Sequence, residues 1–262
     1  MSNKIIYYYQ TFVGLDNLLS NNCKTVTHIN VSSIHFGKND DNSNYIHLND
    51  NDPNDKCFEN LWEQCEKASK YCKVFLMVGG AGGAYNTLFS DFENYYKLLY
   101  NLLKTKPFIS GIDLDIEEYV DLDNIKMLIN VLKNDFKNLE FSSAPISNSM
   151  INDVPGMGGF IYKDLYNSKE GQLISHFNVQ SYGEYSEEVY DQIISNGYDP
   201  KKIVMGSISN QNVNSNINVI EKLYKKYGSN FGGVFNWEYY DSPPGAPNNP
   251  QTWSEIMYHL LK

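Results

Sequence analysis

The stretch that decides the fold is FISGIDLDIE, residues 108–117. Apolar residues alternate along it with residues of another kind, and this period of two is typical of a β-strand. Successive side chains of a strand point to opposite faces, so Asp113, Asp115 and Glu117 share one face. The stretch therefore predicts a strand that is apolar on one side and carries three carboxylates on the other.

Three carboxylates on one strand face are unusual, because an ordinary half-buried strand carries neutral or mixed-sign polar residues there. No basic residue lies among them, so they repel one another, and burial strengthens the repulsion. A fold accepts such a cost where chemistry needs it. The alternative is a solvated acidic edge strand, and the position of the strand in the chain decides between the two.

Seven further segments have the pattern of strands. The eight expected strands are 4–11, 26–36, 73–78, 108–117, 139–146, 174–182, 202–207 and 231–237. The expected helices are 15–21, 57–71, 89–104, 123–136, 187–196, 216–227 and 250–261. We expect a polar loop at 37–55 and a long loop with at most one helical segment at 147–172. Helices between strands imply parallel pairing, so residues 1–262 predict one α/β domain, a single (β/α)8 TIM barrel.

In such a barrel the C-terminal ends of the strands meet at one mouth, where active sites lie. The three carboxylates end the fourth strand. Other residues that end predicted strands are Gly79, Gly80, Gln180, Tyr182 and Trp237. The acidic face is therefore predicted to point into the barrel mouth and not into bulk water.

The composition limits the classes of molecule that the protein could bind. The formal net charge of −10 and a pI of about 4.9 argue against nucleic acid and against an anionic membrane surface. No apolar run reaches the length of a membrane span. The N-terminus lacks the architecture of a signal peptide, so we expect a protein that stays inside a cell or is secreted after loss of a presequence. We expect a monomer.

The cysteines are Cys23, Cys57, Cys65 and Cys72, and their spacing matches no zinc pattern. We expect reduced thiols, with the last three buried as small apolar residues of one helix.

Two ligand alternatives remain open at the mouth. The glycines of segment 79–83 follow a strand and could cradle a phosphate, but the Lys-Ser/Thr ending of a phosphate loop is missing. The oxygens of Asp113, Asp115 and Glu117 are also the ligands that magnesium prefers. We predict neither a metal nor another cofactor.

Segment 111–117, GIDLDIE, resembles the strand-four signature of family 18 glycoside hydrolases, the chitinases and their relatives. Segments 79–80, 179–182 and 232–237 resemble further motifs of that family in the same order. The short chain is similar to the compact plant and fungal chitinases, over residues 5 to about 240.

The resemblance implies retaining hydrolysis of β-1,4-linked N-acetylglucosamine glycans. Glu117 is the expected acid and base, supported by Asp113, while Asp115 orients the substrate's acetamido group. Asp115 shares a face with Glu117, so it cannot stand on the opposite side of a sugar as a second carboxylate would. The resemblance implies that the acetamido carbonyl is the nucleophile, held by Tyr182. The other expected substrate-binding residues are Trp237 as the floor, Gln180, Gly80, Ala81 and Tyr8.

Two residues depart from the family pattern. Ser110 stands where the family has Asp, which is expected to loosen the support below the acidic row. Met77 stands where the family has a Ser that hydrogen-bonds the residue matching Asp113. A buried Asp113 then needs another donor. The resemblance implies Tyr8, because the family places a Tyr on strand one, with Ser142 or Ser143 as alternatives. The resemblance also implies a cis peptide between Trp237 and Glu238.

Two other functions fit the same barrel. One is a chitin- or glycan-binding lectin without activity, although the presence of Glu117 argues against it. The other is an endo-β-N-acetylglucosaminidase that cuts the core of N-glycans.

Overall fold

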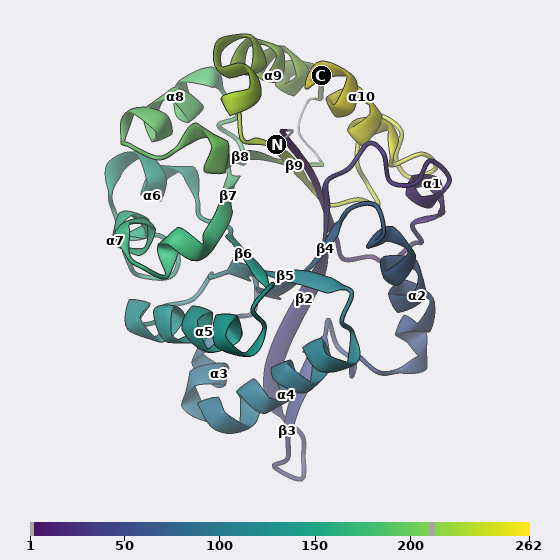
Figure 1. Ribbon diagram of the computed structural model, residues 1–262, viewed down its shortest axis with the longest axis vertical. Helices are drawn as coiled ribbons and strands as arrows, with labels where there is room; N and C mark the ends of the chain where they lie inside the picture. Colours follow the sequence, from purple (N-terminus) through teal and green to yellow (C-terminus); the bar gives the residue numbers. More distant parts are fainter. Residues whose placement is uncertain (1–2, 210–212) are drawn as a thin grey trace.

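Parallel strands close on themselves in the computed structural model, which describes residues 3–209 and 213–262 (Figure 1). The barrel strands are β1 (Lys4–Tyr9), β2 (His28–Lys38), β4 (Lys73–Gly79), β5 (Ile109–Asp115), β6 (Glu140–Ser143), β7 (Ile174–Gln180), β8 (Ile203–Ile208) and β9 (Gly233–Trp237). Strand β1 pairs in parallel with both β2 and β9, and this pairing closes the ring. The structure thus confirms the predicted (β/α)8 barrel.

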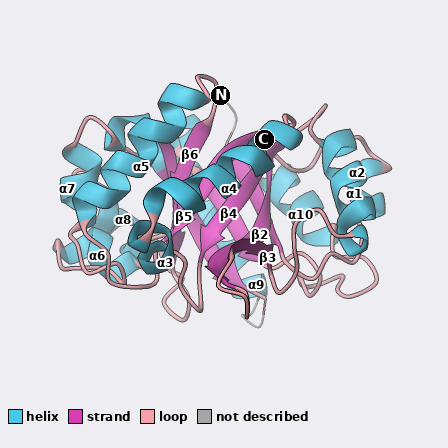
Figure 2. Cartoon of the chain, turned by 90° about the horizontal axis from the view of Figure 1, so that it is seen from below, coloured by secondary structure: helices cyan, strands magenta, loops and turns pink. Residues whose placement is uncertain are grey.

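Helices surround the strands (Figure 2). The longer ones are α2 (Glu59–Ala68), α4 (Phe92–Thr105), α5 (Leu122–Asp135), α8 (Glu187–Ser195), α9 (Val213–Tyr227) and α10 (Thr252–Leu260). The shorter ones are α1 (Asp16–Leu19), α3 (Tyr85–Ser90), α6 (Ser147–Asn152) and α7 (Tyr162–Asn167).

Helix α5 illustrates how the sequence makes these elements. Its start is capped by Asp121, whose carboxylate accepts a hydrogen bond of 2.9 Å from the backbone N–H of Asp123. Its buried apolar residues follow the spacing of one helix face and are Ile125, Leu128, Ile129 and Leu132. That stripe packs the helix onto the barrel. None of the described helices is long and apolar enough to cross a membrane.

The predicted polar loop 37–55 is wrong in its first half. Strand β2 runs on to Lys38, and β3 (Asn44–Leu48) pairs with it as an antiparallel hairpin. The short segment alternates: Ile46 and Leu48 are buried, while the rings of Tyr45 and His47 stack 3.8 Å apart between their centroids. The many Asn and Asp residues around this alternation hid the strand.

Two helical predictions also need correction. The segment 147–172 contains two helices, α6 and α7, where at most one was expected. Their buried residues Met150, Tyr162 and Leu165 anchor them to the core. The predicted helix 89–104 is divided between two helices, because its first residues belong to the end of α3 and the rest to α4. Asp91, whose φ is −151°, separates the two.

The cysteines are free, as predicted, but the predicted burial of Cys57 is wrong. Cys57 is exposed because it lies in a single 3-10 turn, η1 (Lys56–Phe58), ahead of α2. Cys23, Cys65 and Cys72 are buried.

The barrel interior is filled in layers. At the floor, the rings of His28 and His176 lie 5.1 Å apart, and Phe75 packs against both. Gly111 leaves room for the Phe75 ring, which would come within 2.3 Å of a Cβ atom there. Above the floor lies a cluster made of Ile6, Tyr8, Met77, Val204 and Phe235. The acidic residues of β5 stand beside and above this cluster, so the barrel holds them from below.

Candidate active site

The acidic row begins inside the barrel and ends at its mouth. Asp113 and Asp115 have exposed fractions of 0% and 4%, whereas Glu117 is only half-buried. Strand β5 ends at Asp115, so Glu117 lies two residues past the end of the observed strand and not within it, as was predicted. A partly accessible carboxyl group above two buried ones can meet a ligand that the others cannot reach.

Asp113 is held by donors from three other strands. Tyr8 Oη donates to its Oδ2 at 2.7 Å, and Ser142 Oγ donates to its Oδ1. Both were predicted as donors, whereas Ser143 instead donates to the backbone carbonyl of Leu114 at 2.9 Å. The third donor is Asn178 Nδ2, 3.0 Å from Oδ1.

Sequence reasoning missed Asn178. The signal that points to it is the alternation on β7, where His176, Asn178 and Gln180 occupy every second position. Because Gln180 was already expected at the mouth, the same strand face should carry Asn178 one layer deeper.

The carboxyl groups of Asp113 and Asp115 differ in what surrounds them. Burial raises the pKa of Asp113, while the hydrogen bonds from Ser142, Tyr8 and Asn178 oppose that rise. Burial, followed by the charges of Glu117 and Asp113, raises the pKa of Asp115 well above its usual range. Asp115 therefore tends to hold a proton, which it can share in a hydrogen bond with Glu117.

Gln180 joins the two upper carboxyl groups. Its Nε2 lies 3.1 Å from Asp115 Oδ1, 3.3 Å from Glu117 Oε1 and 3.0 Å from the carbonyl oxygen of Ala144. One amide group thus fixes the spacing of the acidic pair against the end of β6.

The glycine pair at the end of β4 contacts the backbone of Asp115. Gly79 and Gly80 have φ angles of 95° and 84°, and the backbone N–H of Gly80 donates to the carbonyl oxygen of Asp115 at 2.8 Å. A Cβ atom at Gly79 would lie 2.2 Å from that oxygen. The glycines therefore allow β4 to approach β5, and this contact accounts for them without a phosphate.

Aromatic residues and polar groups complete the mouth. A hollow of about 460 Å³ is lined by Gln10, Ser33, His35, Asn49, Asp50, Met77, Ala81 and Trp237. The Trp237 ring rests on Tyr8, with centroids 5.2 Å apart. Tyr8 itself is buried and faces Asp113. Burial, followed by the charges of Asp115 and Glu117, raises the pKa of Tyr182 well above its usual range, so its hydroxyl stays a donor.

The end of β9 has the predicted backbone form, because the peptide bond between Trp237 and Glu238 is cis. Glu238 accepts hydrogen bonds from the backbone N–H groups of Gln10 at 2.8 Å and Thr11 at 3.2 Å. A second cis peptide that does not involve proline, between Ser32 and Ser33, was not predicted.

The expectation for Ser110 is wrong. Alternation along β5 places Ser110 on the outer face, where its Oγ donates to the carbonyl oxygen of Val74 at 3.2 Å. There it lines a hollow of about 390 Å³ together with Leu103 and Phe136. Ser110 therefore does not lie below the acidic row. Met77, in contrast, faces inward as the register partner of Asp113.

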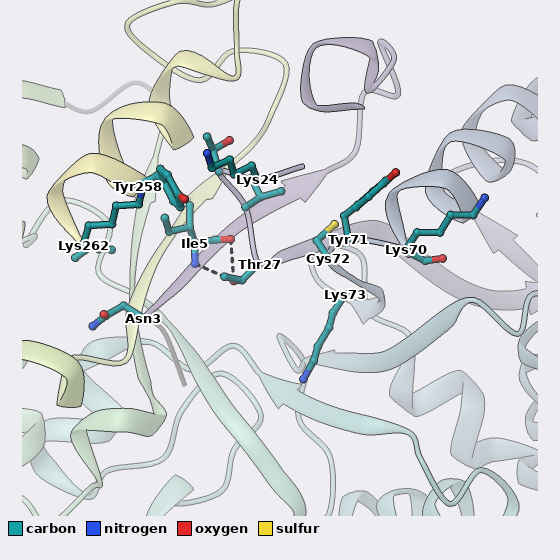
Figure 3. A pocket seen from close by; sticks show the side chains of 14 residues that line it. Asn3, Ile5, Lys24, Thr27, Lys70, Tyr71, Cys72, Lys73, Tyr258 and Lys262 are labelled. Carbon is teal, nitrogen blue, oxygen red and sulfur yellow. Dashed lines mark hydrogen bonds between the residues drawn. The ribbon is translucent and has the colours of Figure 1, made fainter. Parts of the chain in front are cut away.

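A different hollow, of about 550 Å³, lies at the opposite end of the barrel, where the strands begin (Figure 3). Its described lining includes no Asp or Glu but contains Lys24, Lys70, Lys73 and Lys262. Lys70 and Lys262 follow the C-terminal ends of α2 and α10, where the helix dipole favours cations, and Lys73 pairs with Glu140. That placement accounts for Lys70, Lys73 and Lys262 without a ligand.

Within residues 3–209 and 213–262, no three His, Cys, Asp or Glu side chains are arranged to hold a metal ion. Both oxygens of Asp113 already accept hydrogen bonds from protein donors.

Comparisons with known proteins agree with this arrangement. The family model described as "Glycosyl hydrolases family 18" matches residues 4–240. The structure of a fungal endo-beta-N-acetylglucosaminidase from glycosyl hydrolase family 18 is similar at 31% sequence identity and a TM-score of 0.88, covering 99% of this chain and 98% of that one. The chitinase ChiC from Aspergillus fumigatus is similar at 29% identity and a TM-score of 0.84, covering 99% and 100%.

A family 18 chitinase domain from the fern Peteris ryukyuensis is similar at 17% identity and a TM-score of 0.73, over 99% of both chains, which shows the fold alone. A search of curated protein sequences gave no match. Because the family model covers most of the barrel and includes the whole acidic row, the chain belongs to glycosyl hydrolase family 18 and is a glycosidase.

Proposed function

We propose that the enzyme hydrolyses β-1,4-linked N-acetylglucosamine glycans, such as chitin or chitooligosaccharides, and retains the configuration at the cleaved carbon. The acetamido group of the substrate is the nucleophile in this proposal. The observation that carries it is the bridge of Gln180 between Asp115 and Glu117. Two carboxyl groups held by one amide lie on the same side of a sugar, so neither can attack from the other side.

The first step forms a cyclic intermediate. The sugar to be cleaved rests on Trp237, and Glu117 gives its proton to the leaving glycosidic oxygen as the C1–O bond breaks. The acetamido carbonyl oxygen bonds to C1 and leaves an oxazolinium ion. Asp115 accepts a hydrogen bond from the acetamido N–H and offsets the positive charge, while the Tyr182 hydroxyl donates to the acetamido oxygen.

The second step restores the enzyme. Glu117, now ionised, takes a proton from a water molecule whose oxygen attacks C1. The bond between C1 and the acetamido oxygen breaks, and the product leaves with the original configuration. Glucose polymers lack the acetamido group, so the proposal excludes them as substrates.

The decisive experiment compares the wild type with Glu117→Gln on a fluorogenic chitotriose conjugate. We expect the variant to lose at least about a thousandfold in kcat, since Gln can neither give nor take the proton. Lys126→Gln, a change at a half-buried residue on α5, is the matched control and should leave the rate unaltered. Binding without hydrolysis by the wild type would reject the proposal and select a glycan-binding protein instead.

A second candidate is cleavage of N-glycan cores. The similar fungal structure carries the name endo-beta-N-acetylglucosaminidase. The hollow beside Trp237 is rich in hydrogen-bonding groups, among them Gln10, Ser33, Asn49 and Asp50, which suit the hydroxyl groups of mannose. Release of a high-mannose glycan from a glycopeptide at a higher kcat/KM than chitopentaose cleavage would favour this candidate over chitin.

A further inference from the structure

Asn178 is a buried amide in the middle of the barrel. Its Nδ2 lies 3.0 Å from Asp113 Oδ1 and 3.0 Å from Tyr8 Oη, and its exposed fraction is 0%. Tyr8 Oη in turn donates to the other oxygen of Asp113. The three side chains form a closed triangle in which the amide gives both of its protons.

The orientation of the amide follows from its partners. Rotating the group would place Asn178 Oδ1 against the carboxylate of Asp113, where two acceptors repel. In the orientation present, Oδ1 has no hydrogen-bond partner among the described residues. A buried carbonyl without a donor costs free energy. The favourable contribution of Asn178 therefore comes from its two N–H groups.

The neighbouring strand explains why such a donor is needed. Met77 is the register partner of Asp113 on β4, faces inward and is 1% exposed. A thioether cannot donate a hydrogen bond, so β4 offers Asp113 no donor from this position. The donors come from β1, β6 and β7 instead, through Tyr8, Ser142 and Asn178.

We propose that Asn178 is a positioning residue that keeps Asp113 ionised and fixed in place. It thereby supplies the hydrogen bond that Met77 cannot donate. The negative charge of an ionised Asp113 helps to keep one proton on the hydrogen-bonded pair of Asp115 and Glu117, and this is the proton that Glu117 gives to the leaving oxygen in the proposed mechanism. An amide suits this task because it donates without titrating. The inference rests on the proposed function, since it assigns Asn178 to the acid–base row of that mechanism.

The main variant is Asn178→Leu, which has the same branched arrangement of side-chain heavy atoms, although its methyl groups are bulkier, and has no donor. Without the amide, Asp113 takes up a proton at higher pH, because a hydrogen bond to the ionised form is lost. We expect the acidic limb of the pH profile of kcat/KM to move to higher pH by about one unit. We also expect kcat at pH 5 to fall at least about fivefold with KM within about twofold.

The matched control is Ser143→Ala. It also removes a buried donor near the row, but that donor serves the backbone of Leu114 and not Asp113. Its acidic limb should stay where the wild type has it. An equal shift in both variants would show a general effect of core polarity and overturn the inference.

A rescue separates positioning from packing. In Asn178→Leu, the second change Met77→Ser places a hydroxyl on β4 beside Asp113. We expect the double variant to recover at least about half of the shift in the acidic limb, which simple loss of packing would not allow. If the double variant recovers none of the shift, or shows the sum of the effects of the two single variants, Asn178 does not compensate for Met77 and the inference is contradicted.

One measurement does not depend on hydrolysis. Carboxyl ¹³C NMR follows the titration of Asp113 directly, and we expect its midpoint to rise in Asn178→Leu and to rise further in the isosteric Asn178→Asp. If Asn178→Leu fails to fold, Asn178→Asp carries the test alone. A raised midpoint in an enzyme without hydrolysis rejects the proposed function but keeps this inference, whereas an unchanged midpoint overturns the inference.

Discussion

At the scale of single residues, Tyr8 joins the packing of the barrel to its chemistry. Its hydroxyl donates to Asp113 at 2.7 Å, while its ring packs on Phe235 and Trp237 with centroids 5.1 and 5.2 Å away. Burial, followed by the charges of Asp113 and Asp115, raises the pKa of the Tyr8 hydroxyl well above its usual range. The hydroxyl thus stays protonated, and a donor, at a pH where an exposed tyrosine would ionise.

Tyr8→Phe isolates that donor. The ring contacts remain, so we expect turnover to fall at least about fivefold from the lost hydrogen bond to a charged group, with little change in KM. Tyr7→Phe is the matched control, because the Tyr7 hydroxyl bonds Pro250 and Ser254 on the outer side of the barrel. Steady-state kinetics on a chitotriose conjugate would exclude Tyr8 from the site if both variants matched the wild type.

Residues of this kind could be predicted only in part. The need to satisfy a buried carboxylate, together with the resemblance to a family that has a Tyr on strand one, named Tyr8 as a partner of Asp113, and it left Ser142 and Ser143 as alternatives, of which the structure selects Ser142. The alternation of β7 places Asn178 on the inner face below Gln180, but its contact with Asp113 depends on strand register around the whole ring, which the sequence pattern does not give. Ser110 was misjudged because the rule that places Asp113 inward also places Ser110 outward.

At the scale of elements, the approach of β4 to β5 sets the height of Asp115. From Phe75 onward the two strands stay in register up to Gly79 and Asp115, and Gly80 then donates to the carbonyl oxygen of Asp115. This contact needs a backbone without a side chain, which is why glycines stand at the end of the strand.

Gly79→Ala tests that approach. Its Cβ would overlap the carbonyl oxygen of Asp115, in addition to the cost of about 1–2 kcal/mol for a left-handed alanine. Gly82→Ala is the matched control, since Gly82 also has a positive φ of 99° but its nearest neighbour would be His35 at 3.9 Å. Urea denaturation should show a larger loss of unfolding free energy for Gly79→Ala, and its activity should fall too. Equal losses in the two variants would show that only the backbone angle of Gly79 matters, and that its close approach to Asp115 does not.

The elements themselves were predictable where the hydrophobic period was strong. All eight barrel strands were found in the sequence, because buried parallel strands are apolar runs between turn residues. The β3 hairpin and the pair α6 and α7 were missed, since each lies in a segment where polar residues or glycines mask a short period.

At the scale of the whole molecule, the barrel accepts ionisable groups at two depths, and they respond to pH in opposite directions. Asp113 and Asp115 have raised pKa values in the folded state, so between about pH 4 and their folded values the folded state binds more protons and acidification stabilises it. His28 and His176 at the floor have pKa values well below the usual range, with burial as the first cause. Below about pH 6.5 the unfolded chain binds the extra protons, so there acidification destabilises the fold.

The floor pair gives the prediction for the whole molecule. His176 faces His28 and Phe75, and the charges of Lys4 and Lys73 also act on it, so nothing around it favours its charged form. Each such histidine contributes a slope of up to about 1.4 kcal/mol of unfolding free energy per pH unit below about pH 6.5. His176→Gln should therefore show a shallower loss of stability than the wild type between pH 6.5 and 5, measured by urea denaturation. His47→Gln, a partly exposed change on β3, should keep the wild-type slope, and parallel slopes in all three proteins would show that the floor histidine does not couple folding to protons.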